Sequence, residues 1–204
     1  MKSLFIVAVF AIMLAGASQI SYADSFVFVA SLSGPAEAPP NASPGTGFTT
    51  VTYNSVAHTL RVQVSFSGLT AGNTASHIHS ATAVPGAGTA GVATTVPTFP
   101  GFPTGTTSGT YDNTLDLTNL SSYNPAFVTA NGGTAASAEA ALIAGISSGR
   151  AYLNIHTSNF PGGEIRGFLA NAPEPTTMLL LGTGLAGIAA KLGRRRKVNK
   201  SKEA

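Results

Sequence analysis

Hydrophobic and polar residues alternate in short runs along the middle of the chain, and this pattern predicts β-strands. In residues 60–67, Leu60, Val62, Val64 and Phe66 alternate with Arg, Gln and Ser, which is typical of a strand with one face in the core and one in water. The same reasoning predicts further strands at 25–32, 48–53, 76–83, 106–111, 151–157 and 164–169. Short strands separated by turn residues predict an all-β fold, a single Greek-key-like sandwich or barrel.

One segment departs from this alternation. Between Ala135 and Ile146 the apolar residues recur at near-helical spacing, with Thr134 before them as an N-cap and Gly149 after them as a stop. One short helix is therefore expected near 134–147.

Residues 84–109 are rich in Gly, Pro and Thr without periodicity, which predicts a long surface excursion around a brief strand at 91–96. The whole chain is 44% hydrophobic and 9% charged and has 23 Gly and 12 Pro, so it is too apolar for disorder and too rich in glycine for a helical bundle. It has no cysteine, which excludes disulfides, thiolate metal sites and a cysteine nucleophile.

The first residues have the three parts of a secretory signal peptide. Lys2 gives a positive start, residues 4–17 are almost entirely apolar, and Ser21 and Ala23 place small side chains before the cleavage point. The apolar run is shorter than the roughly 20 residues that a membrane-spanning helix requires. We therefore expect signal peptidase to remove residues 1–23 after export through the Sec translocon.

The C-terminal residues 172–204 form a second targeting region. Residues 176–193 are apolar except for Lys191, and as a helix they are about long enough to cross the hydrocarbon core of a bilayer. The basic tail 194–204 is expected to stay in the cytoplasm by the positive-inside bias. This orientation leaves one domain, residues 24–171, outside the inner membrane.

The net charge of +3 and the pI of about 9.4 come from the ends of the chain. Seven of the eleven Lys and Arg residues lie within 191–202, whereas residues 24–175 carry three Arg and seven acidic residues, a net charge of −4. Nucleic-acid binding needs Lys and Arg clustered on the folded surface. The sequence therefore predicts no nucleic-acid partner.

Pro173, Glu174 and Pro175 precede the apolar C-terminal stretch, and an arginine cluster follows it. This order closely resembles the PEP-CTERM sorting signal of Gram-negative bacteria. The resemblance implies that an exosortase, a membrane cysteine protease, recognises the three motif residues and cuts near them. It also implies transient anchoring in the inner membrane and then release to the cell surface or the extracellular space, with exopolysaccharide or surface proteins as partners.

Three parts of the middle region carry a second resemblance. They are Ala-Ser-Leu-Ser-Gly-Pro-Ala-Glu-Ala-Pro-Pro at 30–40, Ala-Ser-His-Ile-His at 75–79, and Tyr-Leu-Asn-Ile-His-Thr at 152–157 with Gly-Gly-Glu-Ile-Arg-Gly at 162–167. Together they look like the CHRD domain, a module named from the repeats of chordin that also occurs in secreted bacterial proteins. The resemblance covers about 26–169 and implies an all-β domain without assigning a reaction.

Strand alternation gives three histidines a common orientation. His77 and His79 lie on the face opposite Ile78, and His156 lies opposite Ile155. If the aliphatic side chains face the core and the strands are neighbours, the three imidazoles converge on one outer face. Neutral imidazoles suit copper and zinc, so the sequence offers a candidate metal site, although the fold requires no cofactor.

Glu164 and Arg166 have the same outward parity and offer an adjacent polar site. The alternative interpretation is structural, with Glu164 and Arg166 as a cross-strand surface pair and the histidines hydrogen-bonded to strand ends or loops. His58 shares the parity of Leu60 and Val62. We interpret it as an inward or strand-end residue rather than a fourth ligand.

No pattern in the sequence points to catalysis. The motifs Gly-x-Ser-x-Gly and His-Glu-x-x-His and a phosphate-binding loop that ends in Lys are absent. We therefore expect an exported, non-catalytic surface or matrix protein with a binding or structural role. The alternative is an extracytoplasmic copper or zinc protein that uses the histidine face.

Overall fold

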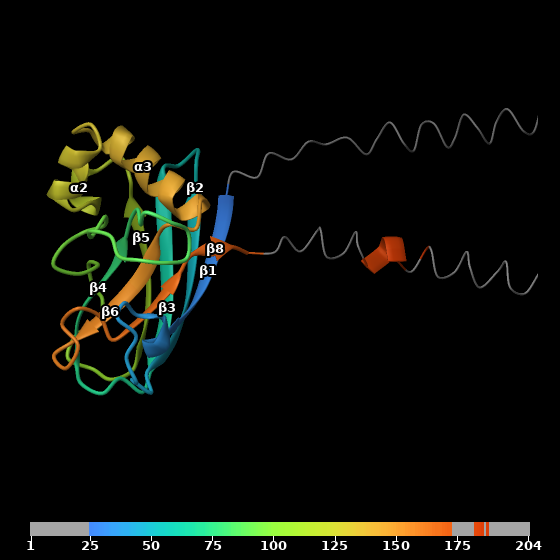
Figure 1. Ribbon diagram of the computed structural model, residues 1–204. Coiled ribbons are helices and arrows are strands. Elements are labelled where there is room, and N and C mark those ends of the chain that lie inside the picture. Colours follow the sequence, from blue (N-terminus) through green and yellow to red (C-terminus); the bar gives the residue numbers. More distant parts are fainter. Residues whose placement is uncertain (1–24, 173–181, 186, 188–204) are drawn as a thin grey trace, which may run out of the picture.

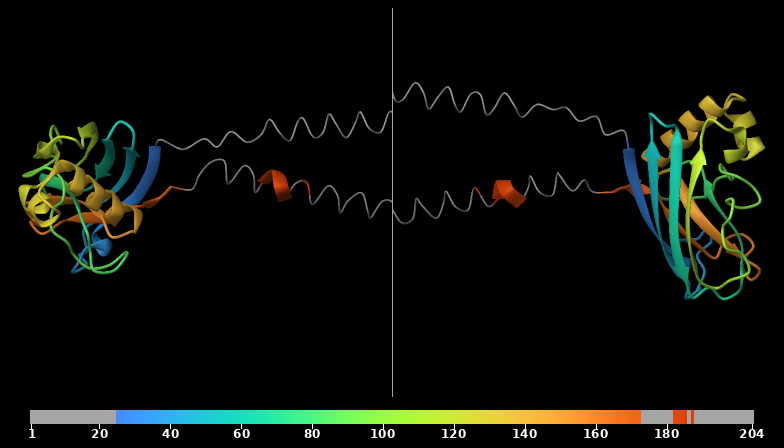
Figure 2. Two further views of the ribbon diagram at one scale, coloured as in Figure 1. Left: turned by 90° about the horizontal axis from the view of Figure 1, so that it is seen from above. Right: turned by 180° about the vertical axis from the view of Figure 1, so that it is seen from behind.

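The computed structural model describes residues 25–172, 182–185 and 187, and its framework is one antiparallel sheet (Figure 1). The strands are β1 Ser25–Ser33, β2 Thr46–Asn54, β3 Thr59–Ser67, β4 Asn73–His79, β5 Gly109–Asp116, β6 Tyr152–Thr157, β7 Ile165–Phe168 and β8 Ala170–Asn171. Their order is β4-β6-β7-β1-β2-β3-β5, with β8 paired to β1. The all-β prediction is confirmed, and the sheet curves into an open half-barrel (Figure 2).

The strand β3 shows why the sheet has an inside and an outside. Leu60, Val62, Val64 and Phe66 are buried, while the residues between them are exposed or half-buried. The inward side chains join one hydrophobic core with those of β1, β2, β6 and β7. Each fully buried aliphatic or aromatic side chain stabilises the fold by about 1.5–3 kcal/mol relative to exposure, so the alternation fixes the register of the strands.

Two α-helices lie together at one end of the sheet (Figure 1). The helix α3 Ala135–Ser147 confirms the predicted helix, and the Thr134 side chain caps it together with Ser137. Gly149, with a positive φ of 67°, follows its end, as expected of a helix stop. The helix α2 Pro125–Ala130 was not predicted, because six residues are too few to show a helical period. Two 3₁₀ turns, η1 Gly34–Ala36 and η2 Leu120–Ser122, complete the elements.

The Gly- and Pro-rich connection between β4 and β5, residues 80–108, covers the free edge of β4. In this described segment, 91–96 forms isolated bridges instead of the expected strand. Its backbone still bonds to β4, as in the hydrogen bond of 2.9 Å from the Ala93 N–H to the Ile78 carbonyl. Most of the segment is exposed, as predicted, but Ala93, Phe99 and Phe102 are buried in the core. Prolines lack the N–H that a regular ladder needs, which explains the irregular path.

The two ends of the domain lie side by side. The strand β8 pairs with β1 through Phe28↔Asn171 and Val29↔Ala170, and Figure 2 shows the start of β1 next to β8. Among the described residues, the buried core lies within 25–172, so this piece has the single hydrophobic core that a domain needs to fold on its own.

The targeting regions predicted from the sequence fall largely on residues that the structure does not describe. The signal peptide 1–23, the motif Pro173-Glu174-Pro175, the tail 194–204 and most of the predicted span 176–193 lie outside the described residues. Among those described, no helix is long and apolar enough to cross a membrane.

Candidate metal centre

The structure brings His77, His79 and His156 together. The strands β4 and β6 are neighbours, and their register pairs His77 with Asn154 and Ala75 with His156. One ring nitrogen from each histidine lies within 4.8 Å of those of the other two. The ring centroids are 5.2–5.8 Å apart, so the three imidazoles surround one small space.

The three imidazoles are buried, which the sequence did not predict. The histidines lie on the sheet face opposite Ile78 and Ile155, as their parity requires, but only 7–9% of each residue is exposed. The connection that follows β4 and the turn between β6 and β7 cover this face. The histidines therefore lie on the predicted outer face of the sheet, but the expected surface position was wrong, because alternation fixes the face of a strand and not what packs over it.

Each imidazole is held by a backbone carbonyl of these covering loops. The Nε2–H of His77 donates to Pro97, the Nδ1–H of His79 donates to Ala90 over 2.9 Å, and the Nδ1–H of His156 donates to Pro161 over 2.9 Å. A carbonyl can only accept, so these contacts place the ring proton on the nitrogen that faces the loop. The second nitrogen of each ring then carries a free lone pair.

These second nitrogens have no partner within the described chain. His77 Nδ1, His79 Nε2 and His156 Nε2 are buried, and none of them has a hydrogen bond to any described residue. The great majority of buried polar atoms in native proteins do have a partner. Three such nitrogens on three rings whose centroids lie 5.2–5.8 Å apart are therefore unusual for a folded domain.

Burial also keeps the three rings neutral. It lowers the pKa of each histidine, because a charged ring would lose its hydration. The carbonyl contacts act in the opposite direction and are weaker, and the pKa of His79 falls to about 4. All three rings can therefore offer a lone pair at neutral pH, and the His79 ring can do so well below it.

Tyr152 organises the site and was missed by the sequence interpretation. Its ring stacks on His79 at 4.8 Å between centroids and nearly parallel. Its hydroxyl lies 3.3 Å from the amide nitrogen of Ala90, whose carbonyl holds the His79 ring. The signal was available, because Tyr152 has the same strand parity as His156.

Glu164 is buried and does not pair with Arg166. Its carboxylate accepts hydrogen bonds from the Ser43 hydroxyl (2.6 Å), the Thr157 hydroxyl (2.6 Å) and the Thr70 N–H (2.7 Å). Burial raises the pKa of Glu164, but these hydrogen bonds outweigh it, so the pKa lies below its usual range. The alternative of a cross-strand surface pair was therefore wrong for this residue.

Arg166 contacts Tyr152, which in turn stacks on His79. Its guanidinium carbon is 4.7 Å from the centre of the Tyr152 ring, and its N–H groups donate to the carbonyls of Ala36 (2.6 Å) and Gly88 (2.9 Å). Its nearest acid is Glu37, at 3.7 Å. Of the two adjacent polar residues that the sequence offered, Arg166 is the one placed next to the cluster.

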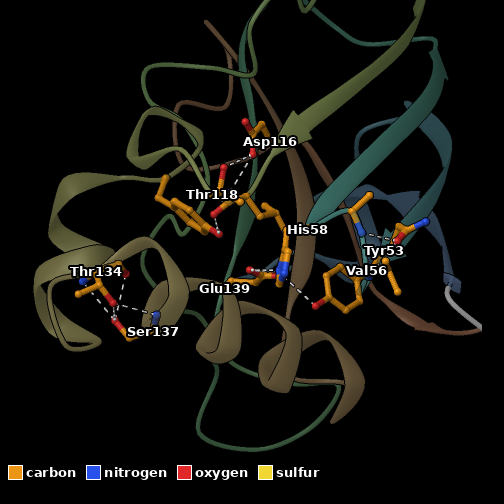
Figure 3. Close-up of polar contacts among 12 residues, drawn as sticks. Tyr53, Val56, His58, Asp116, Thr118, Thr134, Ser137 and Glu139 are labelled. Carbon is orange, nitrogen blue, oxygen red and sulfur yellow. Dashed lines mark hydrogen bonds and ion pairs between the residues drawn. The ribbon is translucent and has the colours of Figure 1, made fainter.

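The fourth histidine lies elsewhere, in the turn between β2 and β3 (Figure 3). The side chain of His58 is 50% exposed, and its Nδ1 lies 3.0 Å from Glu139 of α3, which also accepts from the Tyr53 hydroxyl. The prediction that His58 is not a ligand of the cluster agrees with this position. Of the two positions predicted for His58, the strand end is the one observed, because His58 directly precedes β3, whose alternation begins only at Thr59.

Comparison with known families agrees with this architecture. The model of the CHRD domain matches residues 28–169, and that of the PEP-CTERM protein-sorting motif matches residues 171–197. No curated protein and no solved structure matches the chain. A CHRD domain is a non-catalytic type of domain, and the sorting motif implies export and processing by an exosortase at the membrane of a Gram-negative bacterium. The chain thus belongs to the CHRD domain family, as an exported member with a C-terminal sorting motif.

Proposed function

We propose that this protein is an exported binding protein whose β-domain holds a single copper or zinc ion between His77, His79 and His156. The observation that carries the proposal is the convergence of three buried imidazole nitrogens that have no partner among the described residues. By its sorting route the mature domain reaches the cell surface or the extracellular matrix, where exopolysaccharide and surface proteins surround it.

Energetics support an ion in this space. A buried polar atom without a hydrogen bond costs about 1–3 kcal/mol, and here each of the three clustered imidazoles carries one such nitrogen. A bound ion would satisfy all three at once. The loop carbonyls of Pro97, Ala90 and Pro161 already orient the rings, as partners of the second ring nitrogen commonly do for metal-bound histidines.

The donor set narrows the choice of ion. Three neutral imidazoles suit zinc and copper, whereas calcium and magnesium prefer several oxygen ligands. The ligand atoms of the candidate set are all nitrogens. Ring nitrogens that now lie up to 4.8 Å apart would move closer around zinc, which binds imidazole nitrogen at about 2.0–2.1 Å.

The proposal is tested on purified residues 25–172 that have been stripped with a chelator and then titrated with zinc or copper. We expect one equivalent to bind tightly, and we expect His156→Ala and His77→Ala to lose at least about tenfold in affinity. His58→Ala is the matched control, since it removes an imidazole outside the cluster. Stoichiometric binding that survives both cluster substitutions, or no binding by the folded wild type, would overturn the proposal.

A further inference from the structure

The candidate site offers three neutral donors and no negative charge. Within the described chain, the only set of three or more His, Asp or Glu side chains whose ligand atoms come together is His77, His79 and His156. No carboxylate oxygen belongs to this set. A divalent ion held here would therefore keep its full double charge, because no protein ligand would neutralise any of it.

The carboxylates of the described chain are engaged with other groups. Glu164 accepts hydrogen bonds from two hydroxyls and a backbone N–H, and Glu139 contacts His58 and Tyr53. The acids of β5 lie at the opposite edge of the sheet from β4 and β6. Only Glu37 lies near the cluster's neighbours, and its carboxylate is 3.7 Å from Arg166. The acids thus stabilise other parts of the domain.

The charged group that borders the cluster is positive. The guanidinium carbon of Arg166 lies 4.7 Å from the centre of the Tyr152 ring, and this ring stacks on His79 at 4.8 Å. Only 3% of Arg166 is exposed, and a guanidinium keeps its proton in proteins. Glu37 offsets part of this charge when it is ionised. The remaining repulsion is twice as large for a doubly charged ion as for a singly charged one.

Burial acts in the same direction as this repulsion. The three free ring nitrogens are buried, and only 7–9% of each histidine is exposed. An ion among them leaves most of its hydration shell, and the cost of that transfer grows with the square of the charge, about fourfold from a singly to a doubly charged ion. The environment of the cluster therefore favours a singly charged ion.

The number of donors also favours such an ion. Zinc in proteins is almost always four-coordinate, and Cu(II) prefers tetragonal sets of nitrogen and oxygen ligands. Cu(I) has a filled d shell, accepts imidazole nitrogen, and is stable with three ligands alone. The described chain brings three ligand atoms together and no fourth from His, Asp or Glu.

We infer that the cluster holds copper as Cu(I) in preference to Cu(II) and zinc, and that the charge of Arg166 contributes to this preference across the Tyr152 ring. The inference rests on the proposed function, because it needs the three-histidine site. It narrows the proposed ion from copper or zinc to one metal in one oxidation state. Arg166 is not a ligand in this arrangement, since its N–H groups donate to the carbonyls of Ala36 and Gly88.

Competition with chelators tests the preference on metal-free residues 25–172. Cu(I) is titrated without oxygen against bicinchoninate in the presence of ascorbate, and Cu(II) and zinc are titrated against chelators of known affinity at the same pH. We expect Cu(I) to bind at least about tenfold more tightly than either divalent ion. Silver(I), which has the same charge as Cu(I) and needs no reductant, should compete for the same site.

The Cu(II)/Cu(I) potential of the copper-loaded domain tests the role of Arg166. Arg166→Gln removes the charge and should lower the potential by at least about 59 mV, which corresponds to a tenfold smaller preference for Cu(I). Arg166→Lys keeps the charge and should restore most of the potential. Arg61→Gln is the matched control, because Arg61 is an exposed arginine that pairs with Asp112 on the open face.

The outcomes separate this inference from the proposed function. If Cu(I), Cu(II) and zinc all fail to bind, the three-histidine site itself is wrong. If Cu(II) or zinc binds as tightly as Cu(I), the site stands and the preference for Cu(I) is overturned. An unchanged potential in Arg166→Gln, or an equal fall in Arg166→Lys, would overturn the role of the arginine charge. The wild-type comparison decides the preference even if an Arg166 variant does not fold.

Discussion

The sheet has two halves, one made by β2, β3 and β5 and the other by β4, β6 and β7. Both show the same alternation of hydrophobic and polar residues, but their outward faces have different surroundings. In the first half the outward face is open to water, with Phe48 46% exposed and Arg61 paired to Asp112 at the surface. In the second half every residue of β6 is buried. Its outward face carries the histidine cluster.

The difference lies in the connections and not in the strands. The hairpin between β2 and β3 is short, so nothing in it can fold back over the sheet. The long connection after β4 and the turn between β6 and β7 instead cover their strands and supply the carbonyls that hold His77, His79 and His156. Strand parity therefore selects the side chains that share a face, and loop packing decides whether that face is a surface or a site.

The largest effect should come from removing the buried carboxylate of the covered half. Glu164→Ala leaves the buried Ser43 and Thr157 hydroxyls and the Thr70 N–H without their acceptor. Since each unsatisfied buried group costs about 1–3 kcal/mol, we expect the free energy of unfolding to fall by at least about 3 kcal/mol in urea denaturation. Asp112→Ala on the open half is the control. Equal losses in the two variants would contradict the comparison.

The sequence predicts part of this contrast between the two halves of the sheet, and particular residues show which part. The alternation from Leu60 to Phe66 predicted a strand of the open half, with one face buried and one in water. The parity of His77, His79 and His156 predicted that all three share one face. Their burial was not predictable, because Ala90, Pro97 and Pro161 contribute backbone carbonyls, which any residue carries. Glu37 was also beyond sequence reasoning, since it meets Asn154 only through tertiary packing.

A second effect depends on pH and distinguishes the buried histidines from Glu37. The pKa values of the cluster histidines are lowered, so below pH 6.5 the unfolded chain binds more protons than the folded domain. Their contribution to the stability of the metal-free domain is therefore lost as the pH falls below 6.5, and for His79 this loss continues to about pH 4. Burial raises the pKa of Glu37 to about 7 despite Arg166, so Glu37 acts with the opposite sign between about 7 and 4.5.

Glu37→Gln should therefore steepen the loss of stability. For His79 alone, a pKa of about 4 corresponds to about 3 kcal/mol over this range, as an order of magnitude. Urea unfolding of the metal-free wild type and of Glu37→Gln at several pH values checks the sign. A shallower pH dependence in Glu37→Gln than in the wild type would refute the assignment.

The smallest effect is expected on the open half. Arg61 donates two hydrogen bonds to Asp112, of 2.8 and 2.6 Å, and both side chains are about half exposed. Exposed ion pairs contribute little, because water solvates both partners when they separate. Arg61→Ala should leave the urea midpoint almost unchanged. A loss comparable with that of Glu164→Ala would show that the open face is not the solvated surface described here.

X-ray absorption spectroscopy of zinc-loaded residues 25–172 tests the central claim most directly, because it reports the type, number and distance of the ligands. The account predicts three imidazole nitrogens at about 2.0–2.1 Å, with the imidazole scattering reduced in His156→Ala and unchanged in His58→Ala. A zinc ion surrounded by oxygen alone, or the same imidazole count in His156→Ala as in the wild type, would contradict it.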